Sequence, residues 1–168
     1  MTLLVIYIRL NEESIMFFIA HRGNTQGIVK EKENHPDYLK RALDLGFDIE
    51  VDVWFTNGQV FLGHDGPEHL VDENFFNTID PKKAWYHAKN MEAMYYLRQK
   101  SELNCFWHQE DDCTLTSKGF IWVHPNCPVL PKGSICVLPE LRKTTSGIEN
   151  CGGICSDFIE QYKKQYKS

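Results

Sequence analysis

The order of apolar and polar residues along the chain predicts a series of short strands with a few helices between them. The run from Phe17 to Ala20 predicts a buried strand that ends at His21. The segment from Pro36 to Leu45 has its apolar residues on one helical face, a proline in its first turn and a glycine just past its end. These features together predict a helix.

A β-hairpin is the next element that the pattern predicts. Alternation from Phe47 to Phe55 indicates a strand, and Asn57-Gly58 favours a type I′ turn, because both central residues of that turn need a positive φ. The returning strand covers residues 60–62. Further strands are predicted at residues 85–88, 105–107, 120–123, 135–138 and 153–155, with a helix from Asn90, as its N-cap, to about Arg98.

Size and composition indicate one α/β domain. The chain has 168 residues, of which 42% are hydrophobic, and this is enough for a single buried core. We expect that domain to cover residues 16–168. Residues 1–15 are a possible N-terminal extension, because Met16 directly precedes the first predicted strand of the domain.

Charge and cysteine content exclude some classes of protein. A net charge of -5 argues against nucleic acid as a partner, since binding to phosphate backbones needs clustered basic residues. No apolar run approaches the ~18 residues of a transmembrane helix, and no secretory signal is recognisable. The six cysteines include no CxxC pair. We therefore expect a cytoplasmic protein with reduced thiols and no transmembrane segment.

Polar residues at the ends of predicted strands form a candidate catalytic site. Glu50 and Asp52 share one face of their strand, and two adjacent carboxylates repel each other unless a cation joins them. Such oxygen ligands suit Mg²⁺ or Ca²⁺. Arg22 has a planar guanidinium that matches phosphate oxygens, and His21 and His64 can divide the proton transfers between them. This combination is sufficient for cleavage of a phosphodiester.

Four segments make the prediction more specific. They resemble, in order and spacing, the glycerophosphodiester phosphodiesterase family: Ile19-Ala20-His21-Arg22-Gly23, residues 46–53, residues 56–60 and Gly63-His64-Asp65. Glu33-Asn34 stands where that family has a Pro-Glu-Asn segment. The resemblance implies a TIM-barrel fold, with His21 and His64 as the acid/base pair, Arg22 on the phosphate, and the metal on Glu50 and Asp52.

The resemblance is looser beyond residue 66. Helices become sparse after residue 100, and a full (β/α)₈ barrel takes about 250 residues, so we expect a trimmed TIM (β/α) barrel with reduced helices in its C-terminal half. His87 stands where the family normally has a third metal-binding glutamate, and it favours a softer ion than Ca²⁺. The expected cofactor is Mg²⁺ or Ca²⁺, with Mn²⁺ as an alternative. Lys89 is expected to face the phosphate.

Several residues have two interpretations. Trp122 is assigned to the substrate pocket, with the core as the alternative. Asp65 and Asp157 either orient His64, or line the pocket, or cap helices. Residues 107–112 form a polar and aromatic cluster that either shapes the leaving-group site or is a surface loop. The pairs Cys105-x-x-His108 and His124-x-x-Cys127 suggest a structural zinc site, although residues three apart in a strand face opposite sides.

Together these features predict a metal-dependent hydrolase of a small phosphodiester, such as a glycerophosphodiester. The alternatives are a phospholipase or lyase of the sphingomyelinase D type, a barrel that binds phosphate without catalysis, and a partner-binding module. The oligomeric state has no signal in the sequence.

Overall fold

The computed structural model describes residues 16–167, so the possible extension at residues 1–15 lies outside the described residues. One ten-stranded sheet dominates the fold. Its strands are β1 (Phe17–His21), β2 (Asp48–Thr56), β3 (Gln59–Leu62), β4 (His69–Val71), β5 (Ala84–Ala88), β6 (Asn104–Trp107), β7 (Cys113–Leu115), β8 (Ile121–Val123), β9 (Ile135–Val137) and β10 (Gly153–Ser156).

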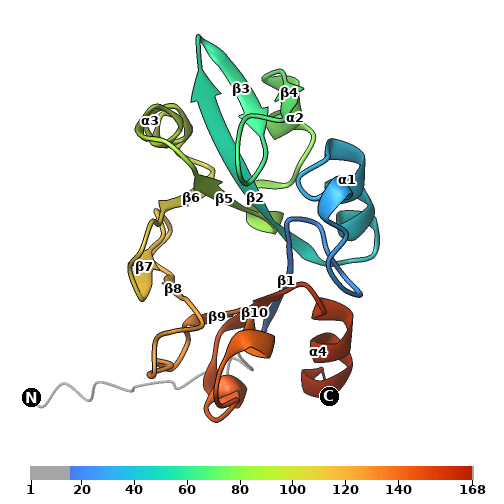
Figure 1. Cartoon of the computed structure of the whole chain (residues 1–168), viewed down its shortest axis with the longest axis vertical. Helices are drawn as coiled ribbons and strands as arrows, with labels where there is room; N and C mark the ends of the chain where they lie inside the picture. The colour runs from blue at the N-terminus through green and yellow to red at the C-terminus, as the bar shows by residue number, and fades with distance from the viewer. Residues whose placement is uncertain (1–15, 168) are drawn as a thin grey trace, which may run out of the picture.

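Four α-helices accompany this sheet in residues 16–167: α1 (Pro36–Asp44), α2 (Asn74–Asn77), α3 (Met91–Arg98) and α4 (Ile159–Tyr166). Short 3₁₀ turns occupy Lys30–Lys32, Pro81–Lys83, Pro139–Leu141 and Ile148–Asn150. The sheet curls strongly, and α1, α3 and α4 lie outside the curl (Figure 1).

Parallel pairing builds the centre of the sheet. Strand β1 lies between β2 and β10 and is parallel to both. The parallel pairs continue from β2 to β5 and β6 on one side, and from β10 to β9 and β8 on the other. The far end of β2 turns into an antiparallel hairpin with β3, which β4 extends. Strand β7 is antiparallel to β8.

The expected TIM barrel is wrong. The structure is a curled, mixed sheet that forms a half-barrel. In the described residues α-helices follow only β1, β4, β5 and β10, so strands and helices do not alternate regularly as in a TIM barrel. In the described residues no strand ladder joins β6 to β8. The seam there is bridged by Ser117, whose amide donates to the Cys105 carbonyl (2.7 Å) and whose Oγ accepts from the Cys105 amide (2.9 Å). Residues 108–120 form turns and strand β7 and contain no helical crossover.

Several local predictions are confirmed. Helix α1 covers the predicted segment, and the ring of His35 accepts a hydrogen bond from the Asp37 amide at its N-terminus. Asn57 and Gly58 both have positive φ values, 52° and 74°, as the type I′ turn requires. At the start of α3 the Asn90 side chain accepts from the Ala93 amide. The sequence pattern did not predict β4, α2 or β7.

Two apolar clusters pack on opposite faces of the sheet. The outer cluster joins the helices to the sheet, and it includes Leu39 of α1, Leu97 of α3 and Ile159 of α4. The inner cluster fills the concave face with the buried side chains of Ile19, Trp85, Phe106, Trp122, Ile135, Val137 and Cys155. Trp122 is only 2% exposed and lies 4.7 Å from Phe106 between ring centroids. Buried apolar side chains therefore fill the concave face at this level.

Within residues 16–167, no helix combines the length and apolar character needed to cross a lipid bilayer. The six cysteines are all free thiols, and four of them are buried in the two clusters or beside them.

Candidate functional site

A layer of polar side chains lies directly beyond the inner apolar cluster. Residues two apart in a strand point to the same face. The side chain two positions after each apolar residue of the inner cluster is therefore expected to point to the concave face as well. By this rule the polar residues on the inner face, at the carboxyl ends of the strands, are His21 after Ile19, His87 after Trp85, His108 after Phe106, His124 after Trp122 and Asp157 after Cys155. Titratable residues at or just after the ends of five different strands therefore lie at one end of the curled sheet.

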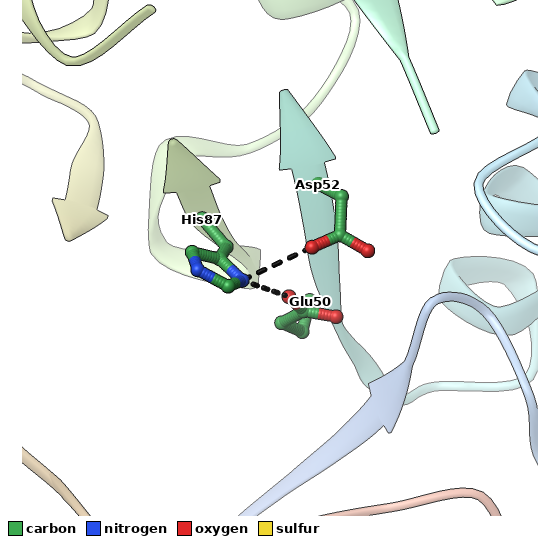
Figure 2. A group of neighbouring side chains, drawn as sticks. All are labelled: Glu50, Asp52 and His87. Atoms are coloured by element: carbon green, nitrogen blue, oxygen red, sulfur yellow. Dashed lines mark ion pairs between the residues drawn. The ribbon is translucent and has the colours of Figure 1, made fainter. Parts of the chain in front are cut away.

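The best candidate for a metal site is formed by Glu50 and Asp52 of β2 and His87 of β5. Each side chain offers one ligand atom, and these atoms lie within 4.8 Å of one another. All three residues are buried, with exposed fractions of 2%, 0% and 9%. Figure 2 shows the His87 ring pointing to both carboxylates. In the described part of the chain, no other group of three or more such residues meets this distance criterion.

The imidazole of His87 is held in one orientation. Its Nε2 lies 3.2 Å from the His108 carbonyl oxygen, and because a carbonyl only accepts, Nε2 carries the hydrogen. The other nitrogen, Nδ1, faces Asp52 Oδ1 at 3.0 Å and Glu50 Oε1 at 3.6 Å. The ring also stacks on Phe106, with planes 11° apart.

A cation fits this arrangement. The buried Asp52 Oδ1 has no hydrogen-bond donor, because His87 Nδ1 lies near it but outside hydrogen-bonding geometry. Without a metal, the lone pair of Nδ1 and two carboxylates face one another, and this is tolerable only if the ring takes a second proton. Burial lowers the pKa of His87, but the nearby carboxylates of Asp52 and Glu50 outweigh burial and raise the pKa to about 9. A divalent ion satisfies the same three atoms.

Asp52 is the centre of the polar network. Its Oδ2 accepts from Asn34 Nδ2 (2.9 Å) and lies near Arg22 Nε (3.1 Å) and His64 Nδ1 (3.2 Å), while Lys89 Nζ is 3.5 Å from its Oδ1. The Asn34 side chain also accepts from the Asp52 amide at 2.9 Å. Burial alone raises the pKa of Asp52, but hydrogen bonds from its histidine neighbours hold it well below the usual range. Asp52 is therefore a carboxylate and a prepared ligand.

His21 forms a buried pair with Asp157. Its Nδ1 lies 2.8 Å from Asp157 Oδ1, and Asn24 Nδ2 donates to the same oxygen at 2.8 Å. Burial lowers the pKa of His21, but Asp157 and Glu50 outweigh burial, so the pKa is raised above its usual value. Asp157 thus orients His21, whereas the sequence suggested that Asp157 orients His64, lines the pocket or caps a helix. The pair leaves His21 Nε2 free for proton transfer.

The backbone at Arg22 is strained and well supported. This residue has a φ of 52°, a conformation that few residues other than glycine adopt, and its amide donates to Glu50 Oε2 at 3.2 Å. Its guanidinium donates to Glu33 at 3.1 Å and to His64 Nε2 at 3.2 Å. Because Asn24 also binds Glu33 (2.9 Å), the guanidinium is held in place beside the carboxylates.

The remaining residues that the sequence assigned to a site differ in their burial and in their distance from the polar layer. Lys89 is beside His64, with Nζ 3.2 Å from His64 Nδ1. Asp65 is exposed, and its Oδ1 lies 3.8 Å from His64 Nε2, which is too long for a hydrogen bond. Trp122 lies in the inner apolar cluster beneath the polar layer, so its contact with a substrate remains a prediction. The four residues of the suggested zinc site do not gather, since Cys105 belongs to the outer cluster.

Asn24 was not indicated by the sequence. The role of Asn34 was not recognised, and His124 was considered only as a zinc ligand. The polar layer shows which signal was available for His124, because it follows Trp122 in the same way that His21 follows Ile19. Asn24 and Asn34 lie in loops, so no strand periodicity marks them.

Comparison with known proteins did not provide an identity: no family model, no curated protein and no solved structure matches this chain. The resemblance to the glycerophosphodiester phosphodiesterase family therefore remains a prediction from the motifs.

Proposed function

We propose that this protein is a metal-dependent phosphodiester hydrolase that acts on a glycerophosphodiester or a similar small phosphodiester. The observation that supports this function best is the buried cluster of Glu50, Asp52 and His87 beside two imidazoles, His21 and His64. The guanidinium of Arg22 lies in the same network. Metal ligands, a phosphate-binding cation and an acid/base pair are the parts that phosphodiester cleavage needs.

Each side chain has a role in this proposal. A divalent ion, when bound, polarises a phosphoryl oxygen. Arg22 and Lys89 bind the other phosphoryl oxygens. His21 Nε2 removes the proton from the attacking oxygen, and Asp157 stabilises the imidazolium that forms. His64, whose side chain is 35% exposed, protonates the departing alkoxide near the solvent. The attacking oxygen is either a neighbouring hydroxyl of the substrate or water.

This function can be tested by release of p-nitrophenol from bis(p-nitrophenyl) phosphate and of alcohol from glycerophosphodiesters. The assay uses Mg²⁺, Mn²⁺, Ca²⁺ or EDTA. We expect turnover that needs a divalent ion and disappears in EDTA. Binding of Mn²⁺ without turnover of any diester would contradict the proposal and indicate a phosphate-binding protein without catalysis.

Among the three candidate ions, we propose Mn²⁺ as the preferred one. The ligand set has two carboxylates and one imidazole nitrogen. Nitrogen ligands bind later transition metals better than they bind Ca²⁺ or Mg²⁺, which prefer oxygen. The His108 carbonyl supports this choice, because a fixed hydrogen bond to the far ring nitrogen is typical of metal-bound histidines.

A His87→Glu variant tests the choice of metal. A third carboxylate adds charge and an oxygen ligand, so we expect the Kd for Ca²⁺ to fall by about 10-fold relative to that for Mn²⁺. Titration calorimetry with both ions measures this ratio. His69→Glu is the matched control, since it makes the same chemical change on β4, and it should leave the ratio unchanged. An unchanged ratio in His87→Glu would exclude His87 as a ligand.

A further inference from the structure

Two histidines outside the proposed metal site stack on each other. His108 follows β6 and His124 follows β8, and their ring centroids are 3.2 Å apart with planes 23° apart. This contact crosses the seam at which β6 and β8 are not joined by a strand ladder. The two rings therefore continue the polar layer where the sheet is open.

The pair lies next to the proposed metal site. The His108 carbonyl accepts from His87 Nε2, and the His108 and His87 ring centroids are 6.1 Å apart. Pairing in the sheet places β2 between β1 and β5, and β6 beyond β5. His108 thus stands on the side of His87 that is opposite to Arg22 and His21.

One ring nitrogen of His124, Nε2, is buried and has no hydrogen-bond partner in the described residues. The residue as a whole is partly exposed. Its backbone is fixed, because its amide donates to the Asp112 carbonyl (2.9 Å) and Arg142 donates to its carbonyl (3.0 Å). A buried polar atom without a hydrogen-bond partner destabilises the folded state, so a ligand group that pairs with this ring recovers stability.

We infer that the stacked His108–His124 pair is a binding site for one ester group of the substrate, and that it recognises hydroxyl groups on that ester. The inference rests on the proposed function for the position of the phosphate, between the metal site and Arg22. From there, one of the two ester groups of a diester extends past His87 toward the pair.

Hydroxyl groups match the pair better than an alkyl chain does. A hydroxyl both donates and accepts, so it can pair with an imidazole nitrogen in either tautomer. A purely alkyl ester would leave the same nitrogen unpaired. Sites built to bind a hydroxyl discriminate against analogues that lack it for this reason.

Binding of two phosphomonoesters tests the inference without any need for turnover. Glycerol 3-phosphate and propyl phosphate have the same carbon chain and differ in two hydroxyls. We expect the wild-type protein with Mn²⁺ to bind glycerol 3-phosphate roughly 10- to 100-fold more tightly by calorimetry, as one or two hydrogen bonds allow. In His124→Phe the two affinities should agree within about 3-fold.

Two further variants complete the test. His69→Phe makes the same change in a histidine outside the polar layer, which packs edge-on against His35. It should keep the preference for glycerol 3-phosphate. His124→Gln retains hydrogen-bonding groups and should keep part of it, which separates lost recognition from misfolding. Equal affinities in the wild type, or a full preference in His124→Phe, would overturn the inference. Absence of diester turnover with the preference intact would contradict the proposed function alone.

Discussion

Replacing His21 with alanine is expected to lower kcat for bis(p-nitrophenyl) phosphate by about 10²- to 10⁴-fold, the range for loss of one general acid or base. The ring of His21 is buried against Asp157 at 2.8 Å, so its loss removes the proposed proton acceptor and leaves the Asp157 carboxylate without its imidazole partner. Because His21 is not one of the three clustered metal ligands, the Kd for Mn²⁺ should change by less than about 3-fold. Steady-state kinetics and calorimetry on the same sample measure both values.

Two variants show whether this effect is specific. His69→Ala removes a histidine outside the polar layer and should retain the wild-type kcat. Asp157→Asn keeps the size of the side chain but weakens the orientation of His21, so an intermediate loss is expected. If His21→Ala retained wild-type turnover, His21 would not transfer the proton and the proposed mechanism would be wrong.

Asp52→Asn is expected to abolish detectable metal binding, with a rise of at least about 100-fold in the Kd for Mn²⁺. Asp52 is fully buried and is the residue on which Asn34, His64 and His87 converge. Its amide replacement removes the negative charge that the ion needs. Loss of one partner from a buried ion pair also costs roughly 3 kcal/mol. Titration calorimetry and denaturation in EDTA measure the two effects separately.

Asp48→Asn is a closely matched control. Asp48 lies on the same strand and is only 3% exposed, but its carboxylate pairs with Lys83 at 2.9 Å, away from the metal ligands. This variant should lose stability and still bind Mn²⁺. Wild-type metal affinity in Asp52→Asn would show that the ion, if it binds, binds elsewhere.

Local periodicity was sufficient to predict the pairing of Glu50 with Asp52, whereas His87 was predicted as a ligand only from the family resemblance. The i, i+2 rule placed Glu50 and Asp52 on one face, and the structure brings His87 to them through the parallel pairing of β2 and β5. The contact between His21 and Asp157 could not be predicted in the same way. These residues are 136 positions apart and meet only because β1 and β10 pair in one particular register.

The fold was harder to predict than the site, for a related reason. Alternation identifies a strand but not its neighbours, so the same pattern suits a closed barrel and an open curl. Whether β6 and β8 pair depends on the conformation of residues 108–120, which connect them. That segment contains β7, a three-residue strand with little burial, which has no periodic signal of its own. The architecture depends on which strands pair with one another, and the alternation in the sequence does not indicate this pairing.

The position of β1 between β2 and β10 has a consequence for how the protein folds during synthesis. The chain is made from its N-terminus, so β1 and β2 are available before β10, which follows them in the sequence. Contacts between such distant segments make folding slow. His21 therefore remains without its carboxylate partner until β10 docks, so the proposed proton acceptor is oriented only after this long-range contact has formed.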